Sequence, residues 1–128
     1  MARLWLMMAA ANGFLAVALG AFGAHGLKRM LEAAPDGALR LQWWQTAAQY
    51  HLAHALALGL VAALAPHLTG RLPGVAGWLF VAGIILFSGS LYVMTLTGVR
   101  ALGAITPVGG VCLLGGWLVL FLAAVRLR

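Results

Sequence analysis

Four long apolar stretches separated by short polar segments dominate the pattern of the chain. They cover about residues 4–27, 41–65, 74–97 and 104–125. A helix needs about 20 apolar residues to cross the hydrocarbon of a bilayer, and each stretch is long enough. None of them alternates apolar and polar residues as the strands of a membrane barrel do. The pattern predicts an all-α, integral membrane four-helix bundle that forms a single transmembrane domain over residues 1–128.

The polar segment at about residues 28–40 predicts an interfacial connector between the first and second helices. It holds both acidic residues of the chain, Glu32 and Asp36, and a Pro-Asp-Gly turn signal at residues 35–37. Apolar residues among the polar ones favour a position on the membrane surface over immersion in water. Because Arg3 precedes the first stretch, that stretch also resembles a signal peptide, but its length and the basic pair after it predict a retained span.

Composition favours a membrane protein over a nucleic-acid-binding one. The chain is 64% hydrophobic and 8% charged, with a formal net charge of +6. Soluble domains carry roughly a quarter charged residues. The basic residues are spread between the apolar stretches, where such residues meet lipid headgroups, and they do not form the basic patch typical of nucleic-acid binding. We therefore expect a multi-pass protein of the cell membrane in contact with membrane lipid, with no nucleic-acid partner.

Basic residues are divided equally between the two sides of the predicted membrane span. The side of the termini has Arg3, Arg71, Arg126 and Arg128, and the side of the connector has Lys28, Arg29, Arg40 and Arg100. The positive-inside rule is therefore balanced. Only the N-terminal amine favours an orientation with both termini inside the cell.

Small residues predict where the helices approach one another closely. Helices in lipid associate through close backbone contact, which small side chains allow. The expected packing residues are Gly13, Gly20, Gly23, Gly89, Gly109, Cys112 and Gly116. The last three lie at i, i+3 and i+7, on one face of a helix. The helix contacts at these residues form either within one chain or between copies of it. The alternative is that these glycines have no packing role, because glycine is common in membrane helices.

Polar side chains gather in the half of the membrane nearer the connector. Ser88, Tyr92 and Thr95 lie at i, i+4 and i+7 and so form one stripe. Polar groups inside a membrane are costly and usually face protein or water. We therefore expect a polar pocket in one leaflet that binds a small molecule or lipid, lined by His25, Gln49, Tyr50, His54, Ser88, Ser90, Tyr92 and Thr106. The alternative is a set of interhelical hydrogen bonds without a cavity.

Four sequence segments resemble one family of small membrane proteins, catalogued as domain-of-unknown-function family 423 and as uncharacterised protein family 0382. The segments are GAFGAHGL (20–27), TAAQYHLAHALAL (46–58), GIILFSGSLYVM (83–94) and GAITPVGGVCLLGGW (103–117). The resemblance implies a four-helix membrane protein without an established activity. It gives weight to the recurrent motif residues His25, Tyr50, His54, Ser88, Gly89, Ser90, Tyr92, Thr106 and Pro107. His51 departs from the family pattern, in which Gln is usual.

Catalytic and metal chemistry receive little support from the residue pattern. Haem binding needs two axial ligands that face each other, for which His25 and His54 are the candidates. No ligand motif of known spacing is present, so we expect no metal or cofactor. Ser88 and Ser90 are candidate nucleophiles, but no acidic residue lies inside a span to orient a histidine base. We expect no catalytic residues and a non-enzymatic role.

A permeation pathway remains an alternative function. It would require a homo-oligomer whose polar stripe faces a pore, and the charged ring typical of ion filters is missing. A membrane-protein partner is the other expected form of assembly.

Overall fold

A computed structural model describes residues 1–126 as four long helical rods joined by short turns. Arg128, which was counted above on the side of the termini, lies outside the described residues. The rods span Ala2–Leu31, Gly37–Leu64, Leu72–Thr97 and Arg100–Val125. Within residues 1–126 there is no strand. The four rods are long and apolar enough to cross a membrane, which confirms the all-α membrane fold predicted from the sequence.

Three of the rods contain a change of helix type. The first consists of α1 (Ala2–Phe22), the π-helical segment η1 (Gly23–Leu27) and α2 (Lys28–Leu31). The second is α3 (Gly37–Leu64), which is uninterrupted. The third consists of α4 (Leu72–Gly83), the π-helical segment η2 (Ile84–Gly89) and α5 (Ser90–Thr97), and the fourth consists of the 3₁₀ turn η3 (Arg100–Ala104) and α6 (Thr106–Val125).

The connector between the first two rods is shorter than the sequence pattern suggested. Only residues 32–36 lie outside helices, because the first rod continues to Leu31 and α3 already begins at Gly37. Leu27 and Leu31 are buried against Trp44 of α3, and this packing extends the first rod beyond its apolar stretch. The turn also depends on Gly37, since a Cβ there would overlap the Leu31 carbonyl oxygen. The apolar pattern therefore marks the middle of each rod better than its ends.

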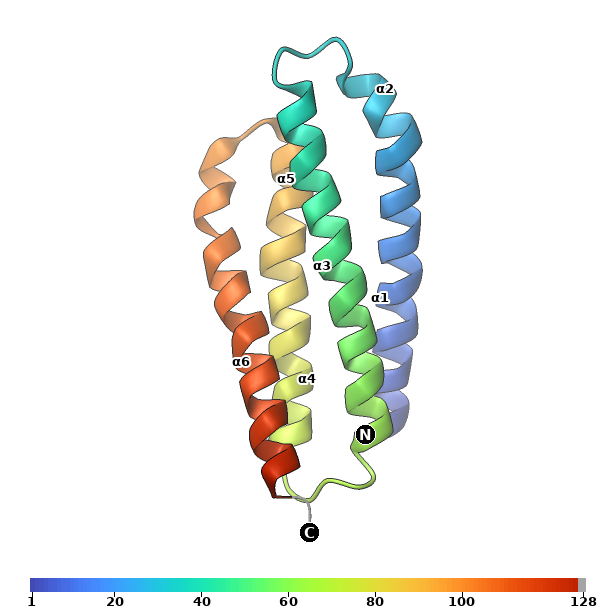
Figure 1. Ribbon diagram of the computed structural model, residues 1–128, viewed down its shortest axis with the longest axis vertical. Coiled ribbons are helices and arrows are strands. Elements are labelled where there is room, and N and C mark those ends of the chain that lie inside the picture. Colours follow the sequence, from blue (N-terminus) through green and yellow to red (C-terminus); the bar gives the residue numbers. More distant parts are fainter. Residues whose placement is uncertain (127–128) are drawn as a thin grey trace.

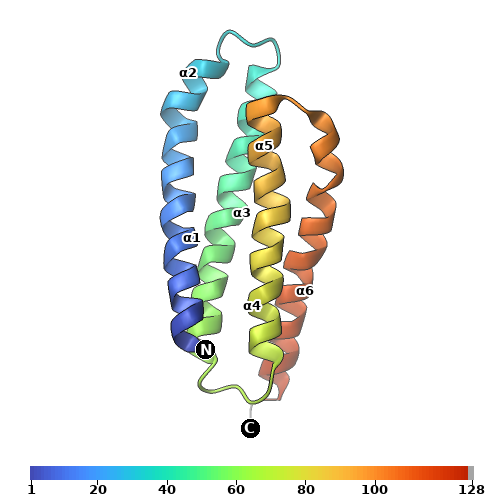
Figure 2. The ribbon, with the colours of Figure 1, turned by 180° about the vertical axis from the view of Figure 1, so that it is seen from behind.

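The rods form an open row in which α1 and α6 are the outer members. The first rod packs on α3, α3 packs on the third rod, and α6 packs on α4 and η2, whereas α1 and α6 make no extended contact with each other. Figures 1 and 2 show the rods running antiparallel, with the N-terminus and the end of α6 at one end and the connector at the other. The outer faces of α1 and α6 are therefore turned toward the surroundings of the chain.

The main hydrophobic core lies in the half of the molecule that holds the termini. Trp5 of α1 is fully buried there and stands edge-on to Trp78, with ring centroids 5.3 Å apart. Phe80 is also fully buried, and the surrounding core residues are Ala57, Leu58, Val61, Ala62, Leu68, Ala76, Ile84, Leu113, Leu120 and Ala123. Most of the interhelical polar contacts lie in the other half, nearer the connector.

The expected packing glycines divide into those with a close neighbour and those without one. A Cβ at Gly23 or Gly116 would press on the ring of Trp44 or Phe80, and a Cβ at Gly109 would meet the η2 backbone. At Gly20 it would lie 3.9 Å from the Ala48 Cβ, and Cys112 is half-buried. Gly13 and Gly89 differ from the expectation, because a Cβ at either would meet no other helix of the described chain. The open row explains Gly13, since α1 has only one extended neighbour.

Candidate functional site

A groove between α3, η2 and α6 opens on the lateral surface of the bundle, the surface that faces lipid in a membrane protein. Its volume is about 450 Å³, and its lining residues are Tyr50, His54, Phe87, Pro107, Gly110, Val111, Leu113, Leu114 and Trp117. The rim residues Val111 and Leu114 are 68% and 72% exposed. The lining is mostly apolar, with polar groups only at Tyr50, His54 and Trp117. The groove is therefore suited to an apolar or amphipathic occupant that enters from the bilayer.

His54 forms the polar floor of this groove. Its Nδ1 lies 2.7 Å from the Tyr50 carbonyl oxygen, and the Trp117 indole Nε1 lies 3.0 Å from its Nε2. A carbonyl can only accept and an indole can only donate. The His54 ring is therefore neutral, with its proton on Nδ1 and its lone pair on Nε2 engaged by Trp117. Both nitrogens are occupied, so His54 positions Trp117 and offers no free lone pair.

A second polar network joins three rods on the other side of α3. Asn12 donates from Nδ2 to the Met8 carbonyl at 2.8 Å, which turns its Oδ1 toward His51. His51 is buried, with Nε2 3.0 Å from the Asn12 Oδ1 and Nδ1 3.0 Å from the Tyr92 hydroxyl. With a neutral ring, His51 donates from Nε2 to Asn12 and accepts at Nδ1 from Tyr92. The network thus connects α1, α3 and α5.

The predicted polar stripe is used in helix packing. Ser88 donates to the Ala47 carbonyl of α3 at 2.8 Å. The Thr95 hydroxyl lies 2.8 Å from the Leu91 carbonyl of its own helix and 3.1 Å from the Arg40 carbonyl of α3. Tyr92 bonds to His51 as described above. The stripe therefore faces α3. Because these side chains point toward α3 within the same chain, the structure does not support a pore lined by them.

The structure separates the eight residues of the predicted pocket into different places. Tyr50 and His54 line the groove, and the hydroxyls of Ser90 and Thr106 lie 2.7 Å apart between α5 and α6. Ser88 and Tyr92 bond to α3 or its side chains. His25 is exposed on η1, and Gln49 is exposed beside a separate cleft between α1 and α3. The eight residues therefore do not line a single pocket.

Three residues of these networks were not among the predicted pocket residues. Asn12 is the one strongly polar side chain in the apolar middle of the first rod, and that isolation was a usable signal. His51 was not among the predicted pocket residues, and its departure from the family pattern argued only against a metal site with His54. Trp117 lies in the middle of its span, away from the interfacial position that tryptophan prefers. A buried polar partner explains that position, since its N–H needs an acceptor.

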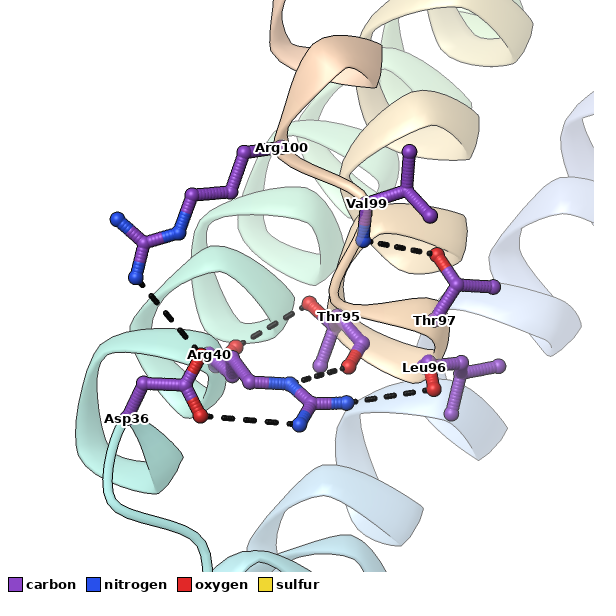
Figure 3. Close-up of polar contacts among 7 residues, drawn as sticks. All are labelled: Asp36, Arg40, Thr95, Leu96, Thr97, Val99 and Arg100. Atoms are coloured by element: carbon purple, nitrogen blue, oxygen red, sulfur yellow. Dashed lines mark hydrogen bonds and ion pairs between the residues drawn. The ribbon is translucent and has the colours of Figure 1, made fainter.

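A cluster of charged residues at the connector end joins the helical hairpin of α1 and α3 to the hairpin of α4 and α6 (Figure 3). Arg40 donates from Nε to the Thr95 carbonyl at 2.8 Å and from Nη2 to the Leu96 carbonyl at 3.3 Å. Its Nη1 lies 3.7 Å from Asp36 Oδ1, and Arg100 Nη2 lies 3.8 Å from Asp36 Oδ2. Arg40 thereby caps the C-terminal end of α5, where the helix dipole favours a cation.

The histidines are not arranged as a metal or haem site. His25 is exposed on the first rod, whereas His54 is buried against Phe80 and Trp117. Both nitrogens of His54 and of His51 are engaged by protein groups. In the part of the chain that the structure describes, no three His, Cys, Asp or Glu residues lie together as metal ligands would.

Replacing His51 with leucine should lower the free energy of unfolding by about 1 kcal/mol, because two interhelical hydrogen bonds in a membrane are lost. His51→Gln should recover most of this loss, since its amide can donate to Asn12 and its carbonyl can accept from Tyr92. Unfolding of the three proteins by detergent titration measures the difference. A glutamine variant as unstable as the leucine variant would contradict the assigned bonds.

Comparison with known proteins places this chain in a family. The model of the family described as "Protein of unknown function (DUF423)" matches residues 19–110. The chain is 49% identical over 125 residues to the UPF0382 membrane protein YwdK of Bacillus subtilis, covering 97% of this chain and 98% of that protein. It is 41% identical over 127 residues to the UPF0382 inner membrane protein YgdD of Escherichia coli strain K12, covering 98% and 92%. No solved structure matches the chain.

These matches confirm the resemblance seen in the four sequence segments. The relatives are named as membrane or inner membrane proteins, and the structure has four rods that can cross a bilayer. The chain therefore belongs to the DUF423 family and is a multi-pass protein of the cell membrane whose relatives carry the name UPF0382.

Proposed function

We propose that this protein is a non-enzymatic membrane protein that binds a lipid chain or a small amphipathic molecule in the groove between α3 and α6. The observation that carries the proposal is the sideways opening of a defined groove over a polar floor. Its volume of about 450 Å³ falls within the roughly 300–1,000 Å³ typical of small-molecule sites. Such sites combine a mostly apolar wall with a few placed polar groups, as this groove does.

The surroundings of the serines support a non-enzymatic role. Ser88 donates to the Ala47 carbonyl, and Ser90 pairs with Thr106 and with the Phe87 carbonyl. An activated serine would instead bond to a base, normally a histidine held by a third group. The Nε2 of His54 is directed to Trp117, away from either serine. These contacts fit hydroxyls that hold helices together.

Gly110 provides a direct test, because it lines the groove and a side chain there would enter it. A Cβ at Gly110 would lie 3.8 Å from the Phe87 Cδ2, an ordinary contact. We expect Gly110→Leu to reduce the lipid that remains bound in mild detergent by roughly tenfold, equivalent to about 1.4 kcal/mol. Native mass spectrometry of the purified protein measures the bound lipid.

Gly13→Leu is the matched control for this experiment. It makes the same substitution inside a membrane helix, at a position where a Cβ has no neighbour within 4 Å among residues 1–126. The control should retain as much lipid as the unmodified protein. Equal retention in all three proteins would refute binding in the groove, and a lipid-free unmodified protein would do the same.

A further inference from the structure

We infer that the occupant of the groove is an anionic phospholipid, with its acyl chain in the groove and its phosphate on Arg100. This inference rests on the proposed function and adds the class of headgroup. The two parts of the site lie on adjoining elements. The groove is built from α3 and α6, and Arg100 begins the η3 turn that leads directly into α6.

Trp43 links the charged end to the groove. The Arg100 guanidinium carbon lies 5.8 Å from the centroid of the Trp43 ring. Trp43 precedes Tyr50 by two helical turns on the same face of α3, about 10 Å along the axis. Trp43 and the groove residue Phe87 also pack on the same buried cluster of Ala47, Leu91 and Met94. Through this shared cluster Trp43, which carries Arg100 over its ring, packs next to the residues that wall the groove.

The spacing fits the layers of a phospholipid. Tryptophan prefers the boundary between headgroups and hydrocarbon, which places Arg100 beside Trp43 at headgroup level. The side chain of a helical residue points toward the N-terminus of its helix. The half-exposed ring of Tyr50 is therefore directed from the groove toward the connector side, where the ester groups of a bound lipid would lie.

The charge within the cluster of Asp36, Arg40 and Arg100 is not balanced. Two guanidinium groups, Arg40 and Arg100, share the single carboxylate of Asp36, which leaves one positive charge. Arg40 is held by the carbonyls of Thr95 and Leu96 as well. The side chain of Arg100 is 65% exposed and its distance to Asp36 is 3.8 Å, so it carries the accessible excess charge.

A guanidinium recognises phosphate through two parallel N–H donors, and a lysine ammonium does so only as a point charge. A phosphodiester with no compensating amine on its headgroup offers a full negative charge to this site. A zwitterionic phospholipid offers a phosphate that is already paired with a cation. Arg100 therefore favours the anionic headgroup.

The experiment is a competition between phosphatidylglycerol and phosphatidylcholine with identical acyl chains, supplied in equal amounts and followed by native mass spectrometry. We expect the unmodified protein to prefer phosphatidylglycerol by roughly fivefold, the effect of about one basic residue at a membrane surface. Arg100→Gln should bind both lipids equally while still retaining lipid. Arg100→Lys should keep part of the preference.

Lys28→Gln removes an exposed basic residue of α2, and it is the control for general surface charge. It should keep the full preference for phosphatidylglycerol. Loss of preference in this control, or its persistence in Arg100→Gln, would overturn the headgroup assignment while lipid retention still supports the groove. A protein that retains neither lipid would overturn the proposed function itself.

Discussion

Gly109→Ala is expected to lower the free energy of unfolding by about 3 kcal/mol, the upper end of the cost of overpacking a core. A Cβ at this position would overlap the Phe87 amide nitrogen and lie 2.7 Å from the Phe87 Cα. Both atoms belong to the η2 backbone, which cannot rotate aside as a flexible side chain can. The α6 helix would have to move away from η2. Detergent-titrated unfolding of the purified protein measures the loss.

The next residue supplies the control for this prediction. A Cβ at Gly110 would make only an ordinary contact with the Phe87 ring, at 3.8 Å. Alanine is also favoured over glycine in a helix by roughly 0.5–1 kcal/mol. Gly110→Ala should therefore be as stable as the unmodified protein or slightly more so. Equal stability of Gly109→Ala and Gly110→Ala would show that η2 and α6 are not in contact along Gly109.

The seam at Gly109 has a consequence for the candidate site. The η2 segment and α6 form two walls of the groove through Phe87, Gly110 and Trp117. Close contact at Gly109 fixes the separation of these walls. Gly109→Ala should therefore reduce both the bound lipid and the free energy of unfolding, whereas Gly110→Leu should reduce the bound lipid alone.

The sequence was sufficient to predict the four spans and part of the helix packing. Apolar stretches of sufficient length leave little alternative to membrane helices, and the spacing of Gly109, Cys112 and Gly116 identifies one face of α6. The neighbours of that face depend on tertiary arrangement. Gly83 illustrates this limit, because its close contact with Leu113 follows from the packing of α4 and η2 on α6. Gly13 illustrates the converse, since in the open row no described residue lies within 4 Å of a Cβ placed there.

The sequence predicted where polar contacts gather better than which residues make them. The sequence placed polar residues in the connector-side half, where most of the polar contacts are found. Helical periodicity gives the face of a residue but not the helix that meets it. The bond between His54 and Trp117 joins residues 63 positions apart, and no local pattern contains that information. Likewise, nothing in the sequence indicated that His25 would be exposed on the first rod.

Arg40→Ala is expected to lower the free energy of unfolding by about 2 kcal/mol, within the range for hydrogen bonds that involve a charged group. Arg40 lies in the first turn of α3, yet its guanidinium caps the carbonyls of Thr95 and Leu96 at the end of α5. It therefore connects the hairpin of α1 and α3 to the hairpin of α4 and α6. Its removal leaves both carbonyls and the adjacent turn dependent on water.

Hydrogen exchange can distinguish this cap from a general effect of charge. The Gly98 amide, which bonds to the Met94 carbonyl at 2.8 Å, should exchange faster in Arg40→Ala because the end of α5 is loosened. Arg29→Ala, which removes an exposed basic residue of α2, should leave both stability and this exchange rate unchanged. If Arg29→Ala gave the same loss, charge alone would explain the result.

Asp36→Asn separates the cap from the ion pair. The Asp36 carboxylate is 3.7 Å from Arg40 and partly exposed, and such pairs contribute about 0–1 kcal/mol. The asparagine variant should therefore lose less stability than Arg40→Ala, while the exchange of Gly98 stays slow. The reverse order would mean that the ion pair, and not the cap on α5, holds the two hairpins together. Because Arg40 keeps its carbonyl partners when Asp36 is neutralised, we expect the cap to dominate.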